Sequence, residues 1–290
     1  MKRILVLPYV QIQNANALSS PYTVGFPAMT SWLGGVHALQ RQLNQQGFSD
    51  VVFKGVSVVS HEFDLHTFKG HGDYVYSIIG TGNPLDKNGD RSAFIEEARC
   101  HLTVSIVIEY SGLDKDDEDK FTTTLCDRLH SRMKFSGGDI INFKQPEILK
   151  IGDDKDYRKL VRKLMPGFVL IERRDLMIDA MNNGQDAIDA MLEYLKTMHR
   201  SEQNEQGKVT WTSERKTSGW IVPIATGFHG ISPIRQASNQ RDPNTPHRFA
   251  ESVVTLGEFK MPYRIKNIDD MLWHYHADIE NNLYLCQHKT

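Results

Sequence analysis

Apolar residues in the first half of the chain follow strand spacing in some segments and helix spacing in others. Short apolar runs rich in valine predict strands, and apolar residues three or four positions apart predict helices. The predicted strands are 4–7, 51–60, 102–110 and either 140–143 or 148–151, and the predicted helices are 28–46 and 116–133. The resulting order, β-α-β-β-α-β, is the split ferredoxin-like pattern.

The second half of the chain mixes helices and strands in an order that matches no familiar pattern. The predicted elements are a basic helix at 156–164, a strand at 168–171, a helix at 185–198, a strand at 219–225 and an element of unassigned type at 253–259. A polar connection at 200–208 is the best candidate for a mobile segment.

These patterns predict an α+β fold in two parts. Residues 1–152 are expected to form a ferredoxin-like domain, with a hairpin-like insertion at about 61–100. Residues 153–290 are expected to form a mixed helix and strand region that packs on this domain. Ferredoxin-like folds serve many functions, so the function must be argued from particular residues.

A long polar segment at 11–27 is the first candidate site. We expect it to be a loop, because Pro8 suits the end of a strand and 11–27 lacks the periodicity of a strand or helix. Its amide and hydroxyl groups can donate and accept hydrogen bonds, and its aromatic rings could stack on a base. The candidate binding residues are Gln13, Asn14, Asn16, Ser19, Ser20, Tyr22, Thr23 and Phe26. Thr30 or Ser31 is expected to cap the following helix.

Two pairs of glycines mark places where backbones can approach closely. Gly34 and Gly35 are expected to allow close packing against the first helix. Gly137 and Gly138 follow the second predicted helix and are expected to end it. Adjacent glycines let backbone amides approach a phosphate, although an ordinary helix C-cap explains the same pair.

The charge of the chain is nearly balanced, with 34 lysines and arginines against 36 aspartates and glutamates. Near neutrality counts against a protein that binds nucleic acid alone by neutralising phosphates. Local basic patches or partner proteins must then supply the attraction. We expect phosphate contacts from arginines in loops and at element ends, namely Arg91, Arg132, Arg235, Arg241 and Arg248.

Composition excludes several other classes of protein. The sequence has neither an apolar run of membrane-spanning length nor a signal peptide, and its three cysteines are scattered, so we expect a soluble cytoplasmic protein. His61, His66 and His71 lie five apart, which fits no zinc pattern. Phosphate-binding and dinucleotide-binding motifs are also missing from the sequence, so we predict neither a metal nor a cofactor.

Six segments resemble the Csy-two, or Cas-five-like, subunit family of type I-F CRISPR-Cas surveillance complexes. They occur in the same order along nearly the whole chain. The segments are IQNANALSSPYTVGFP at 12–27, VHALQR at 36–41, RKLMPGFVLIERR at 162–174, GWIVPIATGFHGISPI at 219–234, RFAESVVTLGEF at 248–259 and MLWHYHA at 271–277.

The resemblance implies a repeat-associated RNA-binding protein (RAMP superfamily) with a fold like an RNA recognition motif. It also implies a subunit that binds the 5′ handle of CRISPR RNA and caps that end of the complex. The implied partners are a large Cas-eight-like subunit and a repeated Cas-seven-like backbone subunit, with target DNA bound by the assembly.

His37 raises the alternative of catalysis, because related RNA-processing enzymes place a general acid/base histidine near the first helix. An imidazole could deprotonate a ribose hydroxyl near neutral pH. However, the sequence pairs no second acid/base group with His37, so we predict a non-catalytic subunit and keep His37 as an RNA-binding candidate. The alternatives are a metal-independent endoribonuclease that uses His37, and a protein-only adaptor whose asparagine-rich loop meets a protein.

Overall fold

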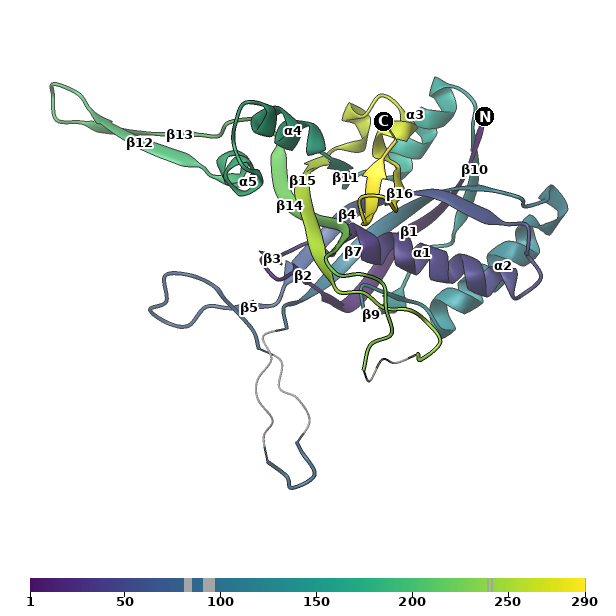
Figure 1. Cartoon of the computed structure of the whole chain (residues 1–290). Helices are drawn as coiled ribbons and strands as arrows, with labels where there is room; N and C mark the ends of the chain where they lie inside the picture. Colours follow the sequence, from purple (N-terminus) through teal and green to yellow (C-terminus); the bar gives the residue numbers. More distant parts are fainter. Residues whose placement is uncertain (81–84, 91–96, 239, 241, 290) are drawn as a thin grey trace.

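The structure is a computed structural model that describes residues 1–80, 85–90, 97–238, 240 and 242–289. Arg91 and Arg241, two of the predicted phosphate-binding arginines, lie outside the described residues. The described chain combines α-helices with a large antiparallel sheet and consists mostly of strands (Figure 1).

Eleven strands of the described residues form a single sheet. They are β1 (Lys2–Asn16), β4 (Val52–Leu65), β7 (Arg99–Ser111), β8 (Lys134–Phe135), β9 (Gly138–Asn142), β10 (Glu147–Ile151), β11 (Phe168–Glu172), β14 (Trp220–Gly230), β15 (Ala250–Lys260), β16 (Trp273–Asp278) and β17 (Leu283–His288). β7 lies between β4 and β1, while β10 and β9 pair in succession with the other edge of β1. β4 also pairs with β11 and β16, so the sheet continues from the first half of the chain into the second.

Two helices, α1 (Met29–Asn44) and α2 (Glu118–Ser131), pack side by side on one face of β1, β4 and β7 (Figure 1). Their apolar residues recur at helix spacing, so each helix presents one apolar stripe to the sheet. Trp32 of α1 and Phe121 of α2 are fully buried there, together with Leu7 and Ile106 of the sheet. This confirms the two helices expected in the first half, each slightly shorter than predicted.

The other face of the same strands is only partly covered. The part around Ile4 and Val6 is covered by α3 (Asp154–Lys163) and by two 3-10 turns, Pro262–Arg264 and Ile268–Met271. The remaining part, near the C-terminal half of β1, carries polar side chains and stays open. The fold therefore leaves one end of the sheet available on its second face.

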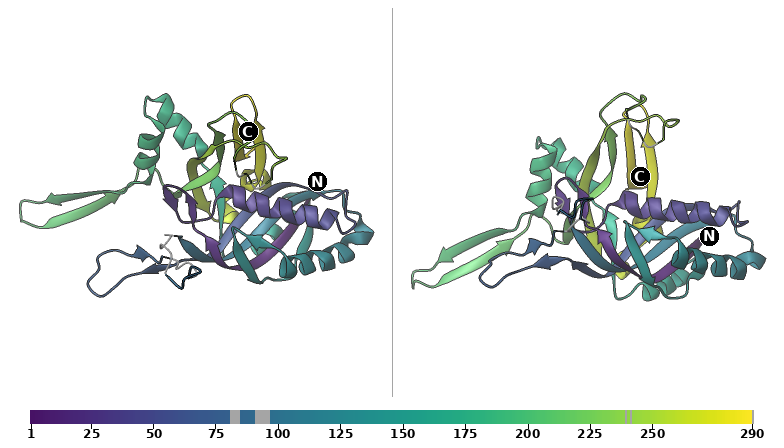
Figure 2. Two further views of the ribbon diagram at one scale, coloured as in Figure 1. Left: turned by 60° about the horizontal axis from the view of Figure 1, so that its bottom comes forward. Right: turned by 90° about the horizontal axis from the view of Figure 1, so that it is seen from below.

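The C-terminal half adds a third core and a projecting arm. α4 (Arg174–Asn182) and α5 (Ala187–Leu195) pack on β14 and β15. The β12–β13 hairpin (Met198–Gln203 and Val209–Glu214) then extends away from the sheet, and the short β5–β6 hairpin (Thr67–Phe68 and Ser77–Ile78) projects from the same end of the molecule (Figure 2). The predicted polar connection at 200–208 is thus largely the tip of a hairpin, and the unassigned segment at 253–259 is part of β15.

The predicted loop at 11–27 is wrong, because β1 continues through Pro8 to Asn16. Two residues of β1, Pro8 and Tyr9, lie opposite the single residue Ser105 of β7, which is a β-bulge. On the other edge of β1, Pro8 lies between the segment that pairs with β10 and the segment that pairs with β9. No backbone N–H is needed for strand pairing at this position. Its carbonyl accepts the N–H of Lys144 instead. A bulge therefore lets the strand pass through proline.

The boundaries of the predicted insertion also change. β4 continues to Leu65 and β7 begins at Arg99, so the segment between these strands is 66–98 instead of 61–100. After β1, residues 18–24 form a small hairpin of β2 (Leu18–Ser20) and β3 (Thr23–Val24). This β2–β3 hairpin is the part of the predicted loop that does leave the large sheet.

Candidate nucleic-acid interface

A groove of about 830 Å³ lies between the first turns of α1, the β2–β3 hairpin and the turn that joins β8 to β9. Its walls carry hydroxyl, amide and cationic groups, together with the Glu97 carboxylate, from segments far apart in the sequence. The residues on which its chemistry depends are Asn16, Ser19, Ser31, Arg99, Lys134 and Gly137. Asn16, Ser19 and Gly137 were predicted from the sequence.

The N-terminus of α1 forms one wall of the groove. Ala28 is the N-cap, no side chain caps the helix, and the first turn contains no acidic residue. The prediction that Thr30 or Ser31 is the cap is wrong, because both lie inside the first turn, where the Ser31 hydroxyl donates to the Ala28 carbonyl at 2.7 Å. An uncapped helix N-terminus offers backbone N–H groups and a positive dipole end, which favour an anion.

The turn between β8 and β9 forms the opposite wall. Ser136 and Gly137 both have positive φ, as the central residues of a tight hairpin turn require. The predicted helix end at Gly137 and Gly138 is therefore wrong: α2 ends at Ser131, and the glycines belong to a hairpin. The Ser136 and Ser31 hydroxyls lie 2.6 Å apart and join this turn to α1.

The four predicted glycines divide between structural and open positions. A Cβ on Gly35 would lie 2.6 Å from the Phe135 ring, and a Cβ on Gly138 would lie 2.8 Å from the Gln13 carbonyl. Glycine at these positions allows close packing of α1 on β8 and of β9 on β1. A Cβ on Gly34 or Gly137 would meet no atom within 4 Å. Only these two leave room for a ligand.

The two cations of the groove were not predicted from the sequence. Arg99 contacts the Glu97 carboxylate and donates to the Asn14 carbonyl at 3.4 Å. Lys134 pairs with Asp139 at 2.6 Å, and both of these side chains are more than half exposed. Exposed ion pairs contribute little free energy, so a phosphate can compete for either cation. The signal that could have indicated Lys134 is its position two residues before Ser136, at the start of the short strand that leads into the Ser136–Gly137 turn.

The polar residues of the predicted loop separate as β1 passes into the β2–β3 hairpin. The Asn16 amide is held against the backbone of Leu18 by hydrogen bonds of 3.0 and 3.1 Å. Ser20 and Thr23 are buried, and their hydroxyl oxygens lie 2.6 Å apart. Tyr22, in contrast, is 67% exposed at the tip of the hairpin. Ser20 and Thr23 therefore stabilise the hairpin and do not present free hydroxyls.

Phe26 is buried, contrary to the expectation of a free ring in a loop. Its ring lies 5.7 Å from that of Trp32 and 5.2 Å from that of Phe259, between centroids. Gln13 and Asn14 lie on or beside the open sheet face, not in the groove, and Asn14 has a φ of 57°. Its N–H donates to the Nδ1 atom of His101.

The remaining predicted residues lie elsewhere. Arg132 and Arg235 are exposed, and Arg248 donates to the Asn282 amide oxygen at 2.6 Å. His37 is exposed on a later part of α1 and faces Tyr275, with ring centroids 6.4 Å apart. The structure does not bring these four residues together with the groove, and their contacts with RNA stay predictions.

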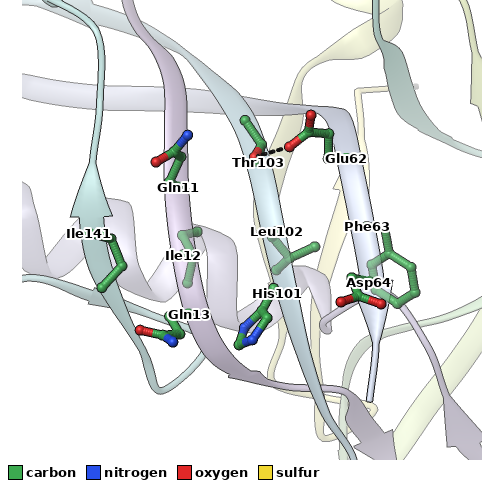
Figure 3. Close-up of a pocket in the computed structure, with 10 residues that line it drawn as sticks. All are labelled: Gln11, Ile12, Gln13, Glu62, Phe63, Asp64, His101, Leu102, Thr103 and Ile141. Atoms are coloured by element: carbon green, nitrogen blue, oxygen red, sulfur yellow. Dashed lines mark hydrogen bonds between the residues drawn. The ribbon is translucent and has the colours of Figure 1, made fainter. Parts of the chain in front are cut away.

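The open face of the sheet is the second polar site at this end of the molecule. A hollow of about 470 Å³ crosses β9, β1, β7 and β4, and its polar side chains lie on the face opposite the helices (Figure 3). Its polar residues are Gln11, Gln13, Glu62, Asp64, His101 and Thr103. Thr103 donates to the Glu62 carboxylate at 2.8 Å. Because its charged groups are carboxylates, this face disfavours phosphate.

A serine–histidine pair lies beside this face, below the bulge in β1. The Nε2 atom of His61 is 2.7 Å from the Ser105 hydroxyl, and its Nδ1 atom is 2.5 Å from the Pro166 carbonyl. Burial lowers the pKa of His61 below its usual value, against an opposing effect of the Pro166 hydrogen bond. Ser105 is fully buried, so the hydroxyl that a nucleophile would need is closed to substrate.

The described residues also show whether metal sites and membrane-spanning helices are present among them. Within the described residues, no group of three or more histidine, cysteine, aspartate or glutamate side chains is arranged to hold a metal ion. Among the described helices, none combines the length and the apolar character needed to cross a membrane.

Comparison with known proteins gives one consistent result. The chain matches the family model described as CRISPR-associated protein (Cas_Csy2) over residues 5–286. It is 33% identical, over 311 aligned positions, to the CRISPR-associated protein Csy2 of Pseudomonas aeruginosa (strain UCBPP-PA14), and the match covers 97% of this chain and 94% of that protein. The chain belongs to the Csy2 family of CRISPR-associated proteins.

Proposed function

We propose that this Csy2-family chain binds the 5′ handle of a CRISPR RNA and caps that end of a type I-F surveillance complex, without catalytic activity. The observation that carries the proposal is the groove, where the uncapped start of α1, the Ser136–Gly137 turn and two cations meet. Backbone N–H groups, hydroxyls and cations are the groups that hold RNA phosphates.

The groove suits a single strand. A phosphate at the N-terminus of α1 would lie within the positive end of the helix dipole, beside the hydrogen-bonded Ser31 and Ser136 hydroxyls. Arg99 and Lys134 would neutralise neighbouring phosphates, and the exposed Asn16 amide would contact a base or sugar. Such contacts depend on a flexible backbone, so unpaired RNA fits better than a rigid duplex.

The proposed fold of the first half is ferredoxin-like, as in RNA recognition motifs and the RAMP superfamily. Its support is the antiparallel strand order β4-β7-β1-β10, together with two helices on one face. This order is what a β-α-β-β-α-β chain gives when its strands pair in the split arrangement. The division of the chain at residue 152 stays a prediction.

The proposed partners follow from the near-neutral charge of the chain. A formal net charge of −2 and a groove with two cations account for only part of the attraction that a guide RNA needs. We therefore propose that a large Cas-eight-like subunit and a repeated Cas-seven-like backbone subunit complete the RNA path. The assembly, not this chain alone, would bind target DNA by guide pairing.

The non-catalytic assignment is supported by the positions of the two histidines that could act as bases. His37 lines a separate pocket beside Tyr275 and not the groove. His61 uses both of its ring nitrogens in contacts with the Pro166 carbonyl and the buried Ser105 hydroxyl. An endoribonuclease would need an acid/base group within hydrogen-bond reach of the bound RNA.

Copurification tests the proposal. The tagged chain is expressed with its neighbouring genes and a repeat-spacer array, and any retained RNA is sequenced. We expect the wild type to retain guide RNA and an Arg99→Ala/Lys134→Ala variant to retain much less. A matched variant, Lys155→Ala/Arg158→Ala on the exposed face of α3, should retain RNA like the wild type.

Two results would count against the proposal. Equal RNA retention by the groove variant and the wild type would remove the groove from the RNA path. Retention of partner proteins without RNA would favour the protein-only adaptor.

A further inference from the structure

A second cavity borders the same β2–β3 hairpin as the groove. Leu18 of β2 lines the groove, and Val24, which pairs with it in β3, lines this cavity. The cavity has a volume of about 420 Å³, within the range of small-ligand sites. Its walls are mainly aromatic, with the rings of Phe26, Phe63, Phe168, Trp220 and Phe259. We call it the aromatic cavity.

The rings form one connected wall. Trp220 lies 5.1 Å from Phe259 and 5.4 Å from Phe168, and Phe26 lies 5.2 Å from Phe259, between centroids. Trp220 is nevertheless 52% exposed and Phe63 is 41% exposed. Adjacent, half-exposed aromatic rings that border a cavity leave apolar surface in water, and such surface marks a binding site.

One end of the aromatic cavity is polar but uncharged. Ser60 and His61 of β4 line it, and no lysine, arginine, aspartate or glutamate is among the lining residues that the structure describes. His61 uses both ring nitrogens in contacts with Ser105 and Pro166. A phosphate would find no counter-charge in this cavity, so its ligand is a flat, neutral group with hydrogen-bonding edges.

We propose that the aromatic cavity takes one unpaired nucleobase of the RNA whose phosphates lie in the groove. The base would stack on Trp220 and direct one edge to the Ser60 hydroxyl. Aromatic stacking accepts any base, whereas contacts to a base edge can select among bases. This inference rests on the proposed function, since it needs RNA in the groove. The two sites are close enough for one RNA strand because the β2–β3 hairpin borders both of them.

An apolar side chain of a partner protein is the competing occupant. An aliphatic side chain of a partner does not require aromatic residues around it, whereas a nucleobase stacks on aromatic side chains. The aromatic walls and the neighbouring groove favour a base. The experiment must still separate the two occupants.

The test uses the four tryptophans of the chain. Trp32 and Trp273 are buried, Trp211 is 69% exposed on β13, and Trp220 lines the aromatic cavity. The probes are a single-stranded RNA with the repeat-derived handle sequence and the free nucleoside adenosine. We expect both probes to quench tryptophan fluorescence in the wild type and in Trp211→Phe, and this quenching to disappear in Trp220→Phe.

Affinity provides the second readout. Trp220→Ala should weaken binding of the single-stranded RNA about tenfold, which is the effect of removing one stacked base. Trp211→Ala is the matched control, since it removes an exposed tryptophan outside the cavity, and it should bind like the wild type. Ser60→Ala should keep the quenching and reduce differences in affinity between RNAs that differ at the bound base.

Each contrary result has a distinct meaning. If Trp220→Ala binds RNA like the wild type while Arg99→Ala/Lys134→Ala binds weakly, the nucleobase inference is overturned and the proposed function stands. If Trp220→Ala instead loses a partner protein with its RNA affinity intact, the cavity is a protein anchor and the inference is also overturned. If adenosine quenches Trp220 but the chain does not retain RNA, the cavity binds a base and the proposed function fails.

Discussion

The groove and the open sheet face are neighbouring sites that differ in charge. Both lie at the same end of β1, which contributes Asn16 to the groove and Gln13 to the open face. The groove adds Arg99, Lys134 and an uncapped helix N-terminus, whereas the open face adds Glu62 and Asp64. The sheet therefore supplies two polar surfaces, and the neighbouring segments decide which one can hold phosphate.

The largest effect is expected from removing the cations of the groove. Arg99→Ala/Lys134→Ala should weaken binding of single-stranded RNA by at least about hundredfold, because hydrogen bonds to charged groups contribute roughly 1.5 to 3 kcal/mol each. The slope of log affinity against log salt should become shallower by about 0.7 for each phosphate that is no longer neutralised. Filter binding at several salt concentrations measures both. An unchanged slope would show that neither cation contacts phosphate.

A glycine pair on α1 separates packing from ligand contact. Gly35→Ala should destabilise the protein by about 1 to 3 kcal/mol, because its Cβ would overlap the Phe135 ring. Gly34→Ala should stabilise it by roughly 0.5 to 1 kcal/mol, since Gly34 lies in a helix with open space around its Cα. Urea unfolding measures both changes. Reduced RNA affinity in the more stable Gly34→Ala variant would indicate that RNA passes close to α1.

The pH dependence of stability tests the packing beneath the open face. Burial lowers the pKa of His61 in the folded protein, so the unfolded chain binds the proton more readily. The free energy of unfolding should therefore fall as pH decreases from about 6.5, the unperturbed histidine pKa, towards the lowered value. His61→Gln should lose about 1 kcal/mol at pH 8 through weaker hydrogen bonds.

The control for this prediction is the difference in the free energy of unfolding between the wild type and His61→Gln at each pH. Below pH 6.5 the stability curve of His61→Gln should be flatter than that of the wild type, with both measured by urea unfolding. Parallel curves would assign the acid sensitivity to other groups.

The smallest effect is expected from the carboxylates of the open face. Glu62→Gln/Asp64→Asn removes two negative charges near the groove, and we expect RNA affinity to rise less than threefold because exposed charges are screened by salt. The measurement is the same binding assay at 0.15 M salt. A large loss of affinity would mean that the open face reads bases directly, since carboxylates can accept from amino groups of bases.

The sequence predicted the elements more accurately than their ends. Trp32, Val36 and Leu39 recur at helix spacing, and α1 forms with these residues buried. Pro8 misled the assignment of β1, because a proline in a central strand is allowed only where a bulge removes the need for its N–H. A bulge shifts the alternation of apolar and polar residues. The pattern therefore indicates a loop where the strand in fact continues to Asn16.

The candidate site was predicted only in part, for a related reason. Asn16, Ser19 and Gly137 do line the groove, whereas Ser20, Thr23 and Phe26 turn inward. Sequence alone does not say which side of a hairpin faces a ligand, because each one-residue step reverses the direction of the side chain. Arg99 and Lys134 were missed because each gains its role from segments distant in sequence.

The amino-acid sequence by itself determined the presence of both helices and of the main strands of the first half, the near-neutral charge and the resemblance to the Csy-two family. These properties depend on local spacing, residue counts and short motifs. The tertiary structure decided where phosphate can bind, because Ser31 meets Ser136 only after α1 packs beside the β8–β9 turn. It also separated the cationic groove from the carboxylates of the open face, since charges far apart in the chain become neighbours only through strand pairing.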